Sequence, residues 1–368
     1  MTREPVLFRV DGTRAAGWEG LARCLGLAYA LQRRRRPCHF LSQLDPAPTL
    51  AALLKKGGNE WLDAGFPAGS PADLEELTQE VRRLRPAAVV VDAPGCGPDY
   101  LAELVALGPL VVCLDTTAAF RFPCQLVVNP TLHPAIDDYE VCPGTQVLLG
   151  RRYALVRPEI RRQRPIRAQE PPTPIRVLVG FGDDPHNLTA RVTHLLLRHA
   201  PKVAQIDILA RPQHPALPEW QALAAANKAD GKSDEPSRTT RVSVSTELGE
   251  IALKVSRCHF ALCDGNAWAL EFACVGVPAL LIVQDEAYWP TAQRLEEEGA
   301  AVCLGWHESV TDTTIKQAVQ NLISDPHERK VMARCGRAFI DGRGPDRLVT
   351  ALEILLHPSR AIDLNEAA

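Results

Sequence analysis

The chain has 368 residues, of which 46% are hydrophobic and 23% charged, and its formal net charge is −3. This composition is typical of a globular protein, and the nearly balanced charge gives no electrostatic case for binding nucleic acid or another strongly anionic partner. Because the length exceeds what one ordinary apolar core organises, we expect two domains.

The eleven cysteines and the N-terminus predict a protein of the cytoplasm, since the first residues do not resemble a signal peptide. No C-x-x-C pair occurs and the ten histidines are dispersed, so neither a metal nor another cofactor is expected. Apolar runs are too short to predict an integral membrane segment. The basic run at residues 33–36 is expected to complete the end of the first helix and to stay solvated, with a membrane or nucleic-acid patch as the less favoured alternative.

The first predicted βα unit runs from residue 6 to residue 23. Val6-Leu7-Phe8, continued by Val10, predicts a buried strand, and a helical pattern opens at Gly17. A strand that passes through a glycine-bearing loop into a helix leaves backbone amides free at the helix start, where anions bind well. The spacing fits neither G-x-G-x-x-G nor a P-loop, so an ordinary first βα unit remains the alternative.

Strands and helices then alternate through the first half of the chain. Residues 87–91 are continuously apolar, as expected for a strand buried on both faces of a parallel sheet. This strand ends in Asp92, and the next predicted strand ends in Asp115. Such polar strand ends are where an open α/β sheet places its ligand, although either aspartate alone is equally consistent with capping the following helix. Further elements are predicted as strands at 38–41, 110–114 and 125–129, and as helices at 73–84 and up to residue 107.

A basic, proline-rich segment at residues 161–174 predicts an interdomain linker, after which the alternation resumes. The fold class predicted is α/β, with two doubly wound Rossmann-like domains at 1–160 and 175–340 and a C-terminal helix and tail at 341–368. Residues 228–237 are expected to be a mobile loop. In this half, strands are predicted at 175–179, 203–209, 242–244, 259–263 and 279–283, and helices from residue 187, within 212–241, at 247–255, 267–275, 291–298 and beyond 313.

Several segments, in this order and spacing, resemble the UDP-sugar hydrolase of pseudaminic acid biosynthesis and its spore-coat-polysaccharide relatives. The resemblance covers nearly the whole chain and implies the two-domain glycosyltransferase-B architecture. It further implies that a UDP-sugar is held in the interdomain cleft, where water attacks the anomeric carbon and UDP is released. The matching segments are residues 90–92 with 99–101, 128–130, 153–159, 182–189 and 341–349.

In the resembled enzymes the catalytic base lies in a Gly-x-Gly-His-x-x-Arg segment at the start of the first helix. This chain keeps Gly17 and Arg23, but Gly20 stands at the histidine position. Glycine has no titratable group, so Glu19 is the only nearby substitute, and Asp92 is the second candidate for a catalytic role. The positive end of the helix dipole stabilises the carboxylate form of Glu19 and thereby lowers its basicity, so an ordinary helix-start carboxylate is the alternative.

The nucleotide-binding half of the resemblance lies in the second predicted domain. Glu271 stands where the family has a ribose-binding glutamate, with a helix-surface charge as the alternative. The family's phosphate loop corresponds to Gly265 and Asn266, but Ala267 and Trp268 replace its small hydroxyl residues, and Trp268 narrows the space. The segment that follows the first strand of this domain supplies three further predicted contacts, Gly182, Asp184 and Asn187. An Asn-Gln pair of the family is replaced by Ala287 and Tyr288.

Three functions therefore remain open at the level of the sequence. The first is a UDP-sugar hydrolase with altered catalytic residues, and the second is a glycosyltransferase that uses a UDP-sugar donor. The third is a non-catalytic descendant that binds a nucleotide sugar or a partner protein. The first two functions require a small nucleotide sugar as the ligand, and so does the third unless the protein binds only a partner protein. None of the three predicts nucleic acid as the ligand.

Overall fold

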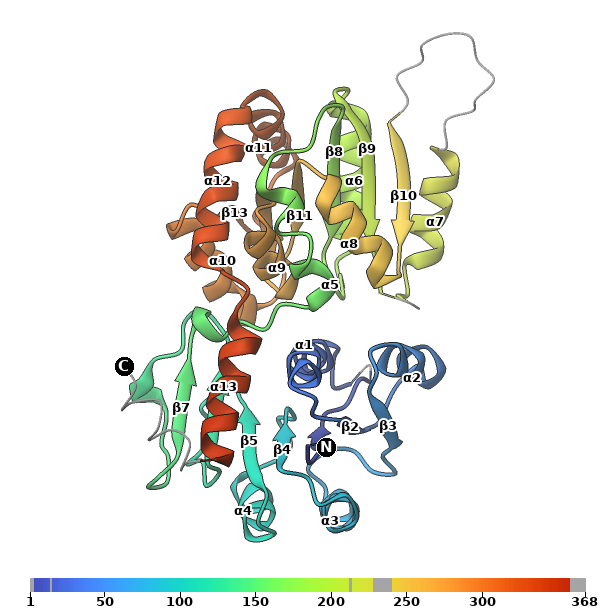
Figure 1. Ribbon diagram of the computed structural model, residues 1–368. Coiled ribbons are helices and arrows are strands. Elements are labelled where there is room, and N and C mark those ends of the chain that lie inside the picture. The colour runs from blue at the N-terminus through green and yellow to red at the C-terminus, as the bar shows by residue number, and fades with distance from the viewer. Residues whose placement is uncertain (1–2, 14, 212–213, 228–239, 358–368) are drawn as a thin grey trace. The chain divides into compact units, whose positions relative to one another are not determined.

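Two parallel β-sheets, each covered by helices, organise the chain (Figure 1). The computed structural model describes residues 3–13, 15–211, 214–227 and 240–357. Contacts divide the chain into a first unit, Met1–Arg157 with Gly342–Ala368, and a second unit, Pro158–Asp341. The chain thus leaves the first unit once and returns to it at its C-terminal end.

The first unit contains a seven-stranded sheet with the strand order β3-β2-β1-β4-β5-β6-β7. All of its strand pairs are parallel, and β1 lies between β2 and β4, so the order reverses direction between β1 and β4. The elements are β1 (Val6–Arg9), α1 (Glu19–Arg33), β2 (Cys38–Ser42), α2 (Ala47–Lys56), β3 (Glu60–Asp63), α3 (Pro71–Leu84), β4 (Ala88–Val91), α4 (Pro98–Ala106), β5 (Leu110–Leu114), β6 (Leu126–Asn129), η1 (Ile136–Asp138), β7 (Gln146–Leu149), η2 (Arg151–Tyr153) and α13 (Gly344–Leu356).

Side chains of β1 alternate between two apolar cores, one on each face of this sheet. Val6 and Phe8 lie in the core formed with α1, α2 and α13, whereas Leu7 lies in the core formed with α3 and α4. Successive side chains of a strand point to opposite faces, so a strand apolar at every position must be covered on both sides. The predicted burial of β4 on both faces is confirmed, since all four of its residues are buried.

The second unit contains a six-stranded sheet with the strand order β10-β9-β8-β11-β12-β13. Its order reverses between β8 and β11, and its core includes side chains from α6, α7, α11 and α12. The elements are α5 (Pro158–Arg161), η3 (Ile166–Ala168), β8 (Ile175–Gly180), α6 (Leu188–His199), β9 (Val203–Leu209), α7 (Leu217–Ala226), β10 (Arg241–Ser245), α8 (Leu248–Arg257), β11 (Phe260–Cys263), α9 (Ala267–Val275), β12 (Ala279–Val283), η4 (Glu286–Tyr288), α10 (Trp289–Glu297), β13 (Ala301–Trp306), α11 (Asp312–Ser324) and α12 (Pro326–Phe339).

The predicted fold class, two doubly wound α/β domains, is confirmed by these two sheets. The sequence patterns missed α2, β3, β7 and β13. The helix expected to open at Gly17 begins at Glu19. The loop predicted at 228–237 lies outside the described residues.

The segment predicted as a linker, residues 161–174, lies in the second unit. There Arg164 donates a hydrogen bond to the carbonyl of Arg337 at 2.7 Å, and Arg167 donates to the carbonyl of Gly276 at 2.8 Å. In the predicted C-terminal segment, residues 341–368, helix α13 packs on α1 in the first unit (Figure 1). The fold therefore uses both segments for packing within a unit.

Candidate functional site

Asp92 follows β4 at the carboxyl end of the first sheet, beside the point where the strand order reverses. Arg23, one turn into α1, donates to both carboxylate oxygens, with Nε–Oδ2 at 3.0 Å and Nη2–Oδ1 at 2.8 Å. Burial lowers the pKa of Arg23, but the charge and hydrogen bonds of Asp92 outweigh this and raise that pKa above its ordinary value. Arg23 and Asp92 therefore form a two-point ion pair.

Capping of the following helix by Asp92, the alternative from the sequence, is wrong. The N-cap of α4 is Gly97, and no side chain caps that helix. Asp115 instead accepts hydrogen bonds from the amides of Thr117 and Ala118 and from the hydroxyl of Tyr139. It closes the turn after β5 rather than a helix.

Gly20 faces the Asp92 carboxylate from the first turn of α1. A Cβ at this position would lie 3.2 Å from Asp92 Oδ1 and 3.3 Å from Val10 Cγ2. These distances are tighter than ordinary van der Waals contact, so a larger side chain here needs Asp92 to move. The absence of a side chain at Gly20 thus allows α1 to approach the end of β4 closely.

Glu19 and Gly17 complete the predicted first-unit group. Glu19 is the first residue of α1, its side chain is 39% exposed, and its Oε2 lies 4.0 Å from Arg23 Nη1. Gly17 has φ +76°, a left-handed backbone conformation that favours glycine, and among the described residues other than its chain neighbours no atom lies within 4 Å of a Cβ built there. The structure therefore brings Glu19, Gly20, Arg23 and Asp92 together, with Glu19 the more accessible of the two carboxylates.

A buried charged network beside this group was not predicted from the sequence. Arg9, which is fully buried at the end of β1, donates to Asp11 at 2.5 Å and to Asp73 at 2.6 Å. Asp11 also accepts the backbone amides of Gln43 and Ala68, which follow β2 and β3. A buried charge is tolerated when it is paired and hydrogen-bonded, so this network fixes the loops at the carboxyl edge of the sheet.

At the second reversal point, the loops that follow β8 and β11 meet. A Cβ on Gly182, which has φ +74°, would lie 2.8 Å from Asn266 Nδ2. A Cβ on Gly265 would lie 2.6 Å from the carbonyl oxygen of Tyr288, a contact that real Cβ atoms do not make. Asn266 caps α9 by accepting the amide of Trp268 at 3.0 Å. Both predicted glycines are thus required for the close packing of this edge.

Asp264, between β11 and this turn, was not predicted as a site residue. Its Oδ1 accepts the amide of Gly265 at 2.6 Å and its Oδ2 accepts the side-chain amide of Gln284 at 3.4 Å. Burial raises the pKa of Asp264 to about 7 despite these hydrogen bonds. The position of Asp264 could have been predicted from the sequence, since it follows a buried strand as Asp92 does. Its raised pKa could not, because it results from burial in the folded chain.

The remaining predicted residues of the β8–α6 loop make internal hydrogen bonds. Asp184 accepts the amides of Leu188 and Thr189 at 2.7 and 2.9 Å, so it caps α6. The amide group of Asn187 donates to Glu219, and its oxygen accepts the indole N–H of Trp220. In this structure both side chains shape the loop, and their contact with a ligand stays a prediction.

Glu271 lies on α9 and is only 2% exposed. The alternative of a helix-surface charge is therefore wrong. Trp268, at the start of the same helix, stacks on Phe272 with ring centroids 5.7 Å apart. The described part of the chain holds no group of three His, Cys, Asp or Glu side chains suited to a metal ion.

Solved structures with the same arrangement cover nearly all of the chain at low sequence identity. MurG of Acinetobacter baumannii matches with a TM-score of 0.61 and 17% identity, over 95% of this chain and 99% of that one. The spinosyn rhamnosyltransferase SpnG, in complex with thymidine diphosphate, matches with a TM-score of 0.60 and 17% identity, over 95% and 100%. The fold is that of the glycosyltransferase-B proteins.

The same architecture also occurs in the UDP-GlcNAc 2-epimerase of Neisseria meningitidis bound to UDP-GlcNAc, with a TM-score of 0.62 and 14% identity over 94% of this chain and 99% of that one. Among curated proteins, the spore coat polysaccharide biosynthesis protein SpsG of Bacillus subtilis (strain 168) is 29% identical over 109 residues. That match spans 30% of this chain and 32% of SpsG. No protein-family model matches the chain. No helix in the described ranges is long and apolar enough to cross a membrane.

Proposed function

We propose that the chain binds a nucleoside diphosphate sugar, with UDP as the nucleotide, at the carboxyl edge of its second sheet. The observation that carries this proposal is the meeting of Gly182 and Asn266 where the strand order reverses between β8 and β11. In open α/β sheets, ligands bind at this point because the flanking loops diverge to opposite faces. The similarity to SpsG and to glycosyltransferase-B structures supports a nucleotide sugar as the ligand.

In this proposal, Glu271 accepts hydrogen bonds from the ribose hydroxyls, and Gly265 and Asn266 lie beside the diphosphate. Asp184 and Asn187 hold the β8–α6 loop in position, since their side chains already make hydrogen bonds within the unit. The protein acts in the cytoplasm, the compartment predicted from its cysteines.

We further propose hydrolysis as the reaction, by analogy with the resembled UDP-amino-sugar hydrolase. Water attacks the anomeric carbon, the bond from that carbon to the phosphate oxygen breaks, and UDP leaves with the electron pair. Of the two carboxylates, Glu19 is the better candidate to accept the proton of water, because it is partly exposed, whereas both oxygens of Asp92 accept hydrogen bonds from Arg23. Asp92 then positions Arg23 and α1.

A second candidate function follows from the same ion pair. If the Asp92–Arg23 pair leaves the first unit without a competent base, the chain binds the nucleotide sugar and does not hydrolyse it. Transfer to an acceptor hydroxyl remains compatible with this fold. The two functions differ in whether free sugar appears.

Calorimetric titration with UDP, UDP-GlcNAc and thymidine diphosphate tests the binding step, and UDP release tests the reaction. We expect UDP binding to weaken about tenfold in Glu271→Gln, because a charged hydrogen-bond acceptor is lost. The matched control is Glu297→Gln on α10, whose carboxylate pairs with Arg294 of the same helix at 3.0 Å. UDP release abolished in Glu19→Gln with binding intact supports hydrolysis, and binding without release in the unaltered chain supports the second function. No binding of any of the three nucleotides refutes the proposal.

A further inference from the structure

The basic run at residues 33–36 does not behave as one solvated helix end. Arg36 is 3% exposed and makes a two-point ion pair with Glu353 of α13, at 2.6 and 3.1 Å. The expectation that the whole run stays solvated is therefore wrong for Arg36, because α13 packs over the end of α1. Arg33, Arg34 and Arg35 are exposed. The run thus divides into a structural arginine and three accessible ones.

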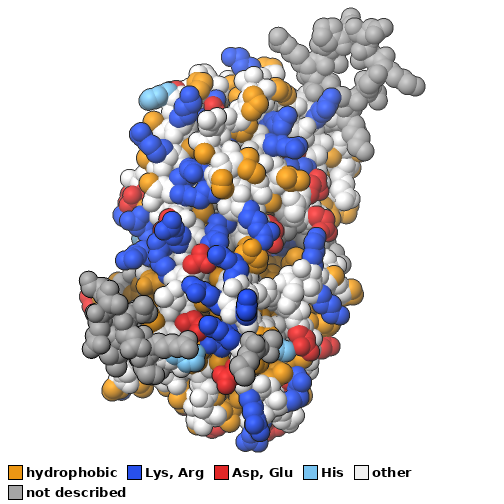
Figure 2. Space-filling view, viewed as in Figure 1, with side chains coloured by type: hydrophobic (Ala, Val, Ile, Leu, Met, Phe, Trp, Pro, Cys, Tyr) orange, Lys and Arg blue, Asp and Glu red, His pale blue; other side chains and the backbone are white. Residues whose placement is uncertain are grey.

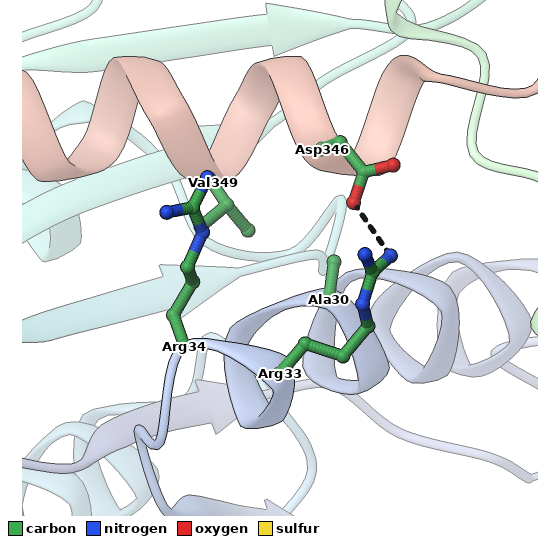
Figure 3. Close-up of a pocket in the computed structure, with 5 residues that line it drawn as sticks. All are labelled: Ala30, Arg33, Arg34, Asp346 and Val349. Carbon is green, nitrogen blue, oxygen red and sulfur yellow. Dashed lines mark hydrogen bonds and ion pairs between the residues drawn. The ribbon is translucent and has the colours of Figure 1, made fainter.

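Two of the accessible arginines line a pocket of about 310 Å³ between the end of α1 and the start of α13. Figure 3 shows Arg33 and Arg34 extending from α1 toward α13, with Ala30 between the helices. Asp346 and Val349 of α13 complete the lining. A pocket of this volume is in the range that accommodates a small organic ligand.

The charges in this pocket favour an anion. Arg33 pairs with Asp346 at 3.1 Å, but both side chains are about half exposed, at 52% and 41%, and such a pair contributes little stability. Within the described ranges, Arg34 has no hydrogen bond or ion pair from its guanidinium. Two guanidinium groups on one pocket outnumber its single carboxylate, and their planar forks match phosphate oxygens.

The shape of the pocket, and not charge alone, distinguishes this place on the surface. Lys and Arg side chains are spread over the face seen in Figure 2, with acidic and apolar side chains among them. The arginine pocket adds an apolar part, from Ala30 and Val349, beside the two guanidinium groups. An inorganic anion uses only the charged part, whereas a phosphate with an organic group uses both.

We infer that this pocket is a second binding site, separate from the nucleotide site of the second unit, for a small phosphate-bearing molecule. The phosphate lies between Arg33 and Arg34 and competes with Asp346 for the guanidinium of Arg33. The organic group attached to the phosphate packs on Val349. The site does not depend on the proposed function, because all of its residues belong to the first unit.

Titration of the full chain with inorganic pyrophosphate, followed by calorimetry, tests this site. We expect Arg34→Gln and Arg33→Gln each to weaken binding about tenfold, the loss of one charge-assisted hydrogen-bonding group. The matched control is Arg35→Gln, since Arg35 is an exposed neighbour that does not line the pocket. Asp346→Asn is expected to strengthen binding about threefold, because it releases Arg33 from its internal carboxylate.

A parallel measurement with phosphatidylglycerol vesicles distinguishes a lipid headgroup from a free phosphate. Vesicle binding that Arg34→Gln removes and Arg35→Gln retains assigns the phosphate to a lipid, and pyrophosphate binding with the same pattern assigns it to a soluble molecule. Equal loss in Arg35→Gln, or no saturable binding of either probe, overturns the site. The two proposals fail independently. Glu271→Gln is expected to weaken UDP binding and to leave pyrophosphate binding at the arginine pocket unchanged, whereas Arg34→Gln is expected to do the reverse.

Discussion

The carboxyl edges of the two sheets share a topology, but their buried aspartates have different hydrogen-bond donors. In the first unit, Asp92 is paired with the guanidinium of Arg23. In the second, the hydrogen bonds that Asp264 accepts from described residues come from neutral donors, the amide of Gly265 and the side chain of Gln284. Burial raises the pKa of Asp264 to about 7, so near neutral pH this carboxyl is partly protonated and repels the diphosphate of the proposed ligand less than a full carboxylate does.

The largest effect is expected from breaking the ion pair of the first edge. Asp92→Ala leaves the buried end of Arg23 without its partner and should lower the free energy of unfolding by about 3 kcal/mol, measured by urea denaturation. Replacing both partners, as Arg23→Met with Asp92→Leu, should cost less than Asp92→Ala alone. Glu19→Gln serves as the control and should change the free energy by less than about 0.5 kcal/mol. Equal losses in the control and in Asp92→Ala would show that the pair contributes nothing specific.

An intermediate effect is expected from filling the tight contact of the second edge. Gly265→Ala places a Cβ against the backbone carbonyl of Tyr288 and should destabilise the second unit by about 2 kcal/mol while weakening UDP binding. Gly249→Ala, in an exposed position of α8 with no atom within 4 Å of the new Cβ, should instead stabilise by up to about 1 kcal/mol. An unperturbed Gly265→Ala variant would contradict the close packing of these loops.

A third effect, on the pH dependence of stability, concerns the charge of Asp264. Burial raises its pKa from 3.8 to about 7, so the folded chain binds a proton that the unfolded chain has released. The stability from this group is present below pH 4 and is lost as the pH rises toward 7, by at most about 1.4 kcal/mol per pH unit.

Asp264→Asn should remove this dependence, which is read as the difference between the two proteins in urea denaturation at several pH values. The difference between the two proteins is needed because His259 adds a pH dependence of its own. Burial lowers the pKa of His259 to about 4, so the free energy of unfolding that this histidine contributes decreases as the pH falls below 6.5. A constant difference between pH 5 and pH 8 would mean that Asp264 titrates normally.

The interior strands were predictable because burial on both faces leaves a continuous apolar run, as in β4 and β12. The missed strands β3, β7 and β13 all lie at an edge of a sheet. An edge strand has one hydrogen-bonded neighbour and is partly exposed, and β3 and β7 accordingly contain polar as well as apolar residues, without a continuous apolar run. Strand β13 is apolar but only its first residue is buried. Helix α2 was missed because Pro48 interrupts the apolar periodicity at its start.

Positions in the candidate site were accessible from the sequence, but their interactions were not. Glu19, Gly20 and Arg23 are neighbours in one segment, and strand ends such as Asp92 follow from the alternation of elements. The pairing of Arg23 with Asp92 joins residues 69 positions apart, and no local pattern indicates it. The pKa of Asp264 and the burial of Arg9 depend on packing by several elements, which only the folded chain specifies.

The return of α13 to the first unit has a consequence for the order of events during synthesis. Leu348, Val349 and Leu352 belong to the same apolar core as Val6 and Phe8. A ribosome must therefore complete the entire second unit before the first one can close its core. Until then the nascent first unit exposes the apolar surface that α13 later covers, so the earliest part of the chain to emerge is among the last to be finished.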